Sequence, residues 1–104
     1  MSRLEKLQQF LDLDPSDSFT RYAIGLEYAA IKEYPSAIAT FEELLAKDRE
    51  YVATYYQLAE AYRITGEKGK AKKTYLDGIT VARKVNDLHA ASELEAAMDE
   101  MEEE

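Results

Sequence analysis

The sequence predicts an all-α protein, a solenoid of antiparallel helix pairs with about six helices in a single domain of 104 residues. The main observation is a pattern of small and aromatic residues that occurs twice at a spacing of 34 residues: Gly25 and Ala59, Tyr28 and Tyr62, Ala37 and Ala71, Phe41 and Tyr75. This period is typical of a helix–turn–helix unit that stacks on its neighbours. The second observation is that apolar residues recur at helical spacing between loops rich in Pro, Gly, Asp and Asn.

The first three helices are expected over residues 3–12, 17–32 and 35–47. Ser2 and Glu5 form a Ser-x-x-Glu capping box for the first helix. Asp14-Pro15 ends this helix, because a residue before proline avoids helical dihedral angles. Ser16 or Asp17 can cap the second helix, and a proline fits the start of the third, where its missing N–H is not needed. The apolar stripes are Leu4, Leu7, Phe10 and Leu11; Ile24, Tyr28 and Ile31; and Ala37, Ile38, Phe41, Leu44 and Leu45.

The last three helices are expected over residues 50–65, 67–84 and 87–102. Gly66 fits a left-handed residue at the end of the fourth helix, and Asn86-Asp87 is typical of a turn followed by a cap. The final Glu102-Glu103-Glu104 is expected to fray. The apolar stripes are Tyr55, Leu58, Ala59 and Tyr62; Ala71, Tyr75, Ile79 and Ala82; and Leu88, Ala91, Leu94, Ala97, Met98 and Met101.

Three glycines lie inside predicted helices, Gly25 in the second and Gly69 and Gly78 in the fifth. A glycine in a helix costs about 1 kcal/mol relative to alanine. Its presence is explained if another helix approaches too closely for a side chain. We therefore expect a close helix crossing at Gly25, and Gly78 is a candidate for a second one.

The net charge of −8 is concentrated at one end. Residues 85–104 hold eight of the 21 acidic residues and no Lys or Arg, so the remainder is neutral. Nucleic-acid binding is not expected, because it requires a clustered positive surface. One basic cluster exists, and it is interpreted as a solvated helix start with any functional role left open: Arg63, Lys68, Lys70, Lys72 and Lys73.

Cysteine is absent, which excludes disulfides, thiol catalysis and Cys-ligated zinc and favours a reducing compartment. No apolar run marks a signal peptide or a membrane span. The expected location is cytoplasmic, with no membrane association.

The paired positions resemble the tetratricopeptide repeat (TPR) family, whose pattern is an aromatic, Leu-Gly and Tyr in one helix and Ala, Phe and Ala in the next. The first copy shows Ile24-Gly25, Tyr28, Ala37 and Phe41. The second copy shows Tyr55, Leu58-Ala59, Tyr62, Gly66, Ala71 and Tyr75. The resemblance implies a right-handed solenoid over residues 1–104: a flanking helix at 3–12, repeats at 17–48 and 50–84, and a capping helix at 87–102.

The sequence departs from this pattern at several positions. Arg21 occupies an aromatic position, Leu44 and Gly78 occupy the last alanine position, and Glu93 would stand where a third repeat needs a small residue. The sixth helix is therefore interpreted as a cap with a polar outer face. Its apolar residues Leu88, Leu94 and Met98 are expected to cover the fifth helix.

Family geometry places one set of side chains in a concave groove: Phe19, Tyr22, Leu26, Tyr56, Glu60 and Arg63, with Ala90 and Leu94 from the sixth helix. Aromatic residues and Arg are common interface anchors. The implied function is a protein-interaction module that binds a peptide or helix of unidentified origin. Two alternatives remain: the tyrosines are ordinary surface residues, or the chain self-associates, for example as a homodimer through the stripe of its first helix.

Other functions are not expected. One TPR subclass holds chaperone C-terminal tails with a Lys/Asn/Arg clamp, but the matching positions here are Tyr22, Leu26, Gln57, Asp87 and Ala91. Catalysis is not expected, because the single histidine, His89, has no cysteine or triad partner and no phosphate loop is present. The C-terminal glutamates lack a loop that would fix Ca²⁺. No cofactor or metal is therefore expected.

Overall fold

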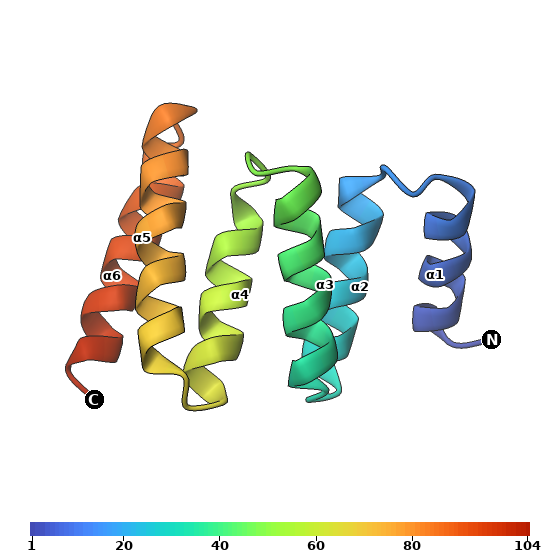
Figure 1. Ribbon diagram of the computed structural model, residues 1–104, viewed down its shortest axis with the longest axis horizontal. Helices are drawn as coiled ribbons and strands as arrows, with labels where there is room; N and C mark the ends of the chain where they lie inside the picture. Colours follow the sequence, from blue (N-terminus) through green and yellow to red (C-terminus); the bar gives the residue numbers. More distant parts are fainter.

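The computed structural model describes residues 1–104 as six α-helices without β-strands. The helices are α1 (Arg3–Leu13), α2 (Ser18–Ala30), α3 (Tyr34–Lys47), α4 (Ala53–Ile64), α5 (Lys68–Lys84) and α6 (Leu88–Glu102). They stand side by side in chain order, each antiparallel to the next (Figure 1). Beyond the sequential pairs, only α2 with α4 and α4 with α6 make substantial contact. This nearest-neighbour packing confirms the all-α solenoid of helix pairs.

The helix boundaries follow local chemistry. Ser2 and Glu5 form the capping box, and Asp17, rather than Ser16, caps α2 by accepting the backbone N–H of Thr20. Asp87 caps α6 in the same way, through the N–H of Ala90. The fourth helix begins at Ala53, three residues later than predicted, because residues 50–52 form the turn that follows α3. None of the helices combines the length and apolar character needed to cross a membrane.

Left-handed residues form the turns inside the two repeats. Gly66 has a φ of 85°, as predicted for the α4–α5 turn. Lys32, which lies 34 residues earlier in the α2–α3 turn, has a φ of 62° and was not predicted. A side chain in this conformation is strained, because its Cβ crowds the following carbonyl oxygen. The same turn geometry is therefore imposed on both repeats, although only one of them supplies glycine.

The core lies where α3, α4 and α5 meet and continues to α6. Phe41 and Tyr75, the paired aromatics of the repeat, are both fully buried. A Cβ atom on Gly25 would lie 2.2 Å from the Phe41 ring, and one on Gly78 would lie 2.5 Å from Cβ of Tyr55. Both predicted close crossings are confirmed, and the cost of glycine in each helix is explained by this approach.

The departure at Arg21 has a direct structural explanation. Nη2 of Arg21 donates a hydrogen bond to the carbonyl oxygen of Pro15 at 2.6 Å. In the second repeat the hydroxyl of Tyr55 donates to the carbonyl oxygen of Arg49 at 2.7 Å. Donors and acceptors are both 34 residues apart. Two different side chains thus hold the same loop carbonyl, which is why a buried arginine replaces the aromatic residue without disturbing the repeat.

Several packing expectations were wrong. Ile31 is 59% exposed because α2 ends at Ala30, and Leu88 is 61% exposed as the first residue of α6. The buried face of α6 consists of other members of its predicted stripe: Ala91, Leu94, Ala97 and Met101. Phe10 is exposed because α1 packs against α2 alone.

The C-terminal end differs from the expected frayed tail. Glu102 belongs to α6, and the N–H groups of Glu103 and Glu104 bond back to carbonyl oxygens of the helix. The side chain of Glu104 lies on Arg63 of α4. Arg63 therefore gives this acidic end a cationic partner that the helix itself lacks.

Candidate functional site

A concave pocket of about 430 Å³ lies between α2, α4 and α6. Its lining is mainly apolar and aromatic: Tyr22, Val52, Ala53, Tyr56, Gln57, Asp87, His89, Ala90, Glu93 and Leu94. The tyrosines at 22 and 56, which the 34-residue spacing predicted to be neighbours, both line it. Ala90 and Leu94, predicted from α6, do so as well. The lining therefore combines all three helices of the concave face.

Two tyrosines, Tyr22 and Tyr56, line this pocket, and a third, Tyr51, packs against the Tyr22 ring from outside the lining. The Tyr22 ring lies 5.4 Å from the Tyr51 ring and 6.1 Å from that of Phe41, and is tilted against both. Such tilted pairs stabilise the arrangement beyond the area they bury. Tyr56 is 38% exposed and presents its ring to solvent. Tyr51 was missed, because it precedes α4 in a turn where no helical periodicity marks it.

The hydroxyl groups of these tyrosines remain protonated at neutral pH. Burial raises the pKa of Tyr22 and of Tyr51. The pKa of Tyr56 is raised by burial and then by the nearby carboxylates of Glu60, Glu100 and Glu93. Each hydroxyl can therefore both donate and accept a hydrogen bond to a bound segment.

Phe19 and Leu26 contribute less than predicted to the pocket. Phe19 lies on the first turn of α2 and is 70% exposed, outside the pocket lining. Leu26 is half-buried and packs against the core. A role for either side chain in binding stays a prediction, and the structure makes Leu26 mainly a packing residue.

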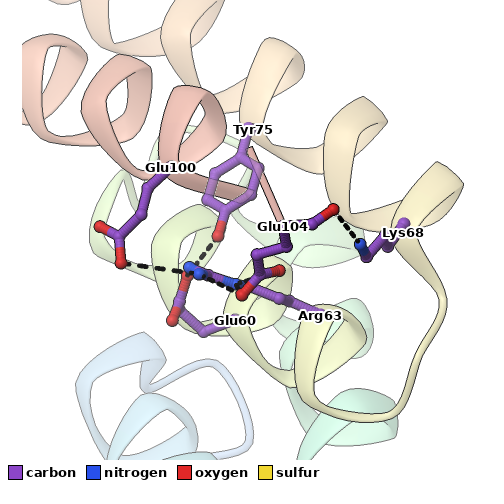
Figure 2. A network of polar contacts seen from close by, with 6 residues as sticks. All are labelled: Glu60, Arg63, Lys68, Tyr75, Glu100 and Glu104. Atoms are coloured by element: carbon purple, nitrogen blue, oxygen red, sulfur yellow. Dashed lines mark hydrogen bonds and ion pairs between the residues drawn. The ribbon is translucent and has the colours of Figure 1, made fainter. Parts of the chain in front are cut away.

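Glu60 and Arg63 belong to a polar network beside the pocket (Figure 2). Nη2 of Arg63 lies 2.7 Å from Oε2 of Glu104 and 3.6 Å from Oε1 of Glu100, and Nη1 lies 3.5 Å from Oε2 of Glu60. The Tyr75 hydroxyl donates to the same Glu60 oxygen. Three carboxylates therefore share the guanidinium group of Arg63, and a role for Arg63 or Glu60 in binding a partner stays a prediction.

The predicted basic cluster is largely paired with carboxylates. Lys70 pairs with Glu67 at 3.2 Å, Lys72 with Glu102 at 3.1 Å and Lys73 with Asp77 at 2.9 Å. Nζ of Lys68 reaches the Glu104 carbonyl oxygen at 3.5 Å. Exposed pairs of this kind contribute little to stability. They do cancel the local positive charge, which supports the interpretation of a solvated surface.

Polar residues of α6 complete the pocket rim and were not predicted as groove residues. Asp87 and Glu93 line it, together with His89, whose Nε2 lies 3.1 Å from Oε1 of Glu93. The side chain of His89 is 87% exposed, so it lies on the surface. No Lys or Arg lines the pocket, and no group of three or more His, Asp or Glu residues is placed to hold a metal ion.

This geometry defines a helical-repeat scaffold: helix pairs stacked on their neighbours, with alternate helices lining one concave face. The chain is 40% identical to a tetratricopeptide repeat domain protein from Salinibacter ruber. Its solution structure aligns over 86% of this chain and 90% of that one, with a TM-score of 0.81. A crystal structure of the tetratricopeptide repeat domain protein from this organism aligns over 83% and 97%, with a TM-score of 0.78. The chain therefore belongs to the tetratricopeptide repeat family.

More distant structures share the fold alone. The TPR2B domain of yeast Sti1, in its complex with pHsp70, is 21% identical over 96% of this chain and 80% of that one, with a TM-score of 0.90. The type III secretion translocator chaperone SycD of Yersinia enterocolitica is 17% identical over 95% and 69%, with a TM-score of 0.86. No protein-family model matches the chain, and no curated protein matches it.

Proposed function

We propose that this protein is a non-catalytic interaction module that binds a peptide or helix in the pocket between α2, α4 and α6. The observation that carries the proposal is the exposed Tyr56 ring beside Tyr22 in a concave, mainly apolar pocket. Aromatic side chains of this kind supply large contact area at low entropic cost. An amphipathic helix laid into such a groove would bury one apolar face against these rings.

Membership of the TPR family supports this proposal at the level of the protein class. Two proteins of the same fold, the Sti1 domain in its complex with pHsp70 and the chaperone SycD, act on other proteins. The residues of this chain differ from the carboxylate clamp. We therefore propose binding through aromatic and apolar contacts in the pocket, and not through capture of a C-terminal carboxylate.

A displayed library of short random peptides tests the proposal. The intact chain is used for selection, and enriched peptides are titrated against ¹⁵N-labelled protein. Tyr56→Glu is expected to abolish binding without unfolding the chain, because the side chain is on the surface. Leu76→Glu is the matched control, since Leu76 is 46% exposed on α5 and lines no part of the pocket. Peptides whose binding is unchanged by Tyr56→Glu would contradict the proposal.

Tyr22 is a poorer site for this test. It packs against the core, and its ring contacts those of Phe41 and Tyr51. A charge at this position would destabilise the fold as well as remove a contact surface. Loss of binding in Tyr22→Glu would therefore be ambiguous, whereas loss in Tyr56→Glu is not.

Self-association is the second candidate function, and the exposed side chains of α1 favour it. Phe10 is 59% exposed and Leu13 is 84% exposed, on a helix that packs against α2 alone. Light scattering coupled to size exclusion, over a wide concentration range, distinguishes the monomer of 11.9 kDa from a dimer. Phe10→Glu is expected to dissociate a dimer formed through α1. A monomer at every concentration would exclude this candidate.

A further inference from the structure

We propose that the segment bound in this pocket is basic, with Lys or Arg next to an apolar side chain. This inference rests on the proposed function and specifies the chemistry of the partner. The distribution of charge around Tyr22 and Tyr56 favours such a segment. The apolar lining alone would accept segments of any charge, so the rim decides between them.

The α6 side of the pocket is acidic. Asp87 and Glu93 line the pocket and no Lys or Arg does. Oδ1 of Asp87 accepts the backbone N–H of Ala90 at 3.1 Å as it caps α6, and Asp87 has no ion pair. The only ion pair of Glu93 is with His89, which carries charge only when protonated. The side chain of Glu93 is 59% exposed and is free to meet a cation from solvent.

Acidic residues also outnumber basic ones beside Tyr56. Burial raises the pKa of the Tyr56 hydroxyl most, the nearby carboxylates of Glu60, Glu100 and Glu93 raise it further, and Arg63 opposes them. Arg63 is the single guanidinium shared by Glu60, Glu100 and Glu104, as Figure 2 shows. The side chain of Glu100 is 75% exposed, and its Oε1 makes the longest of the three contacts with Arg63, at 3.6 Å. Glu100 therefore remains available to a second cation.

Carboxylates also lie beside Tyr51, whose ring packs against that of Tyr22. The pKa of Tyr51 is raised by burial and then by the carboxylates of Asp17 and Asp48. Both carboxylates accept hydrogen bonds from hydroxyl groups, Asp17 from Thr20 and Asp48 from Ser18, each at 2.7 Å. These bonds hold the carboxylates in place without neutralising them. Negative charge therefore lies beside Tyr56 and beside Tyr51, the tyrosine that packs against Tyr22.

This combination selects a cationic segment for two reasons. The face of a tyrosine ring is electrostatically negative and attracts Lys or Arg placed over it. Carboxylates around the ring add to this attraction and repel an acidic segment, which gives discrimination as well as affinity. An apolar side chain next to the cation would enter the pocket lined by Val52, Ala90 and Leu94.

The same peptide selection tests this inference. The quantity to examine is the charge of the peptides whose binding is lost in Tyr56→Glu, called Tyr56-dependent peptides. We expect these peptides to be enriched in Lys and Arg next to apolar residues, and their affinity to fall as NaCl rises from about 0.02 to 0.3 M. Tyr56-dependent peptides that are neutral or acidic would overturn the inference and leave the proposed function standing. A selection without any Tyr56-dependent peptide would overturn both.

A pair of charge reversals on α6 makes the test specific to the pocket. Glu93→Lys is expected to weaken an enriched basic peptide on the order of tenfold, by placing a like charge at the rim. Asp99→Lys is the control: it causes the same change in net charge on the same helix, at an exposed residue that does not line the pocket. Its effect is expected to stay within about twofold. Equal weakening by both variants would indicate attraction by net charge alone and would contradict binding at this rim.

Discussion

Thr54 offers the sharpest test of the physical reasoning, because its hydroxyl is buried without a partner. Thr54 is fully buried, and its Oγ1 makes no hydrogen bond. In the first repeat the equivalent Thr20 donates to Oδ2 of Asp17 at 2.7 Å. The residue 34 positions after Asp17 is Tyr51, which offers no such acceptor. The second repeat has thus kept the threonine and lost its carboxylate.

Thr54→Val is therefore expected to stabilise the protein. Valine keeps the shape of threonine and has a similar helix propensity, while it removes a buried hydroxyl whose desolvation costs about 1–3 kcal/mol. Taking the lower end, about 1 kcal/mol, the midpoint of thermal unfolding should rise by about 4–8 °C for a domain of this size. Circular dichroism during heating, with urea unfolding as a second measurement, determines the change.

Thr20→Val is the matched control and is expected to have the opposite sign. It is the same substitution at the equivalent residue, but here it removes a hydrogen bond to a carboxylate. The free energy of unfolding should therefore fall. If both variants change stability in the same direction, the assignment of an unpartnered hydroxyl at Thr54 is refuted.

Three further predictions concern strain and ionisation. Gly25→Ala is expected to lower the free energy of unfolding, measured by urea titration, by about 1–2 kcal/mol. The reason is that a Cβ 2.2 Å from the buried Phe41 ring costs more than the helix propensity that alanine gains. Gly69→Ala is the control and should not destabilise the protein in the same titration, because no atom lies within 4 Å of the new Cβ. Lys32→Gly is expected to raise stability by about 0.5–1 kcal/mol through relief of its left-handed strain, and an unchanged unfolding midpoint would contradict this. Burial, with nearby carboxylates adding to it, raises the pKa of Tyr62 to about 12. The contribution of the protonated hydroxyl to stability is therefore fully present below pH 10 and is lost as pH rises through 12. An ultraviolet absorbance titration should show this hydroxyl ionising after the exposed tyrosines, and its ionisation near pH 10 in the folded state would contradict the prediction.

Much of the fold could be predicted because each helix contacts mainly its sequence neighbours. Local capping chemistry at Ser2 and the small residue at Gly25 can both be recognised in the sequence, since their partners lie in the same or the next helix. The 34-residue period also predicted that Tyr22 and Tyr56 would share one pocket. Lys32 gave no such signal, because its left-handed conformation is imposed by the turn and not favoured by its side chain.

The limits of prediction at the site are also physical. Arg63 was expected in the groove, but its ion pair with Glu104, 41 residues away in the sequence, was not predicted. The periodicity of apolar residues indicates which face of a helix is buried, but it does not indicate which surface residues form ion pairs across long sequence distances. The acidic rim at Asp87 and Glu93 was missed for a related reason: both residues were assigned by their place in a repeat pattern that α6 does not follow.

The sequence by itself determined the repeat, the order of the helices and the close crossings at Gly25 and Gly78, because these depend on period, side-chain size and local capping. The tertiary structure decided which polar groups meet. It placed Arg63 among three carboxylates, left the Thr54 hydroxyl without an acceptor, and brought carboxylates close to Tyr56 and Tyr51. The stabilisation from burying apolar area adds up along a stack of helices, so it can be recognised in the sequence pattern of apolar residues. Hydrogen bonds and ion pairs depend on the positions of individual atoms from several helices at once, and a sequence pattern does not give these positions.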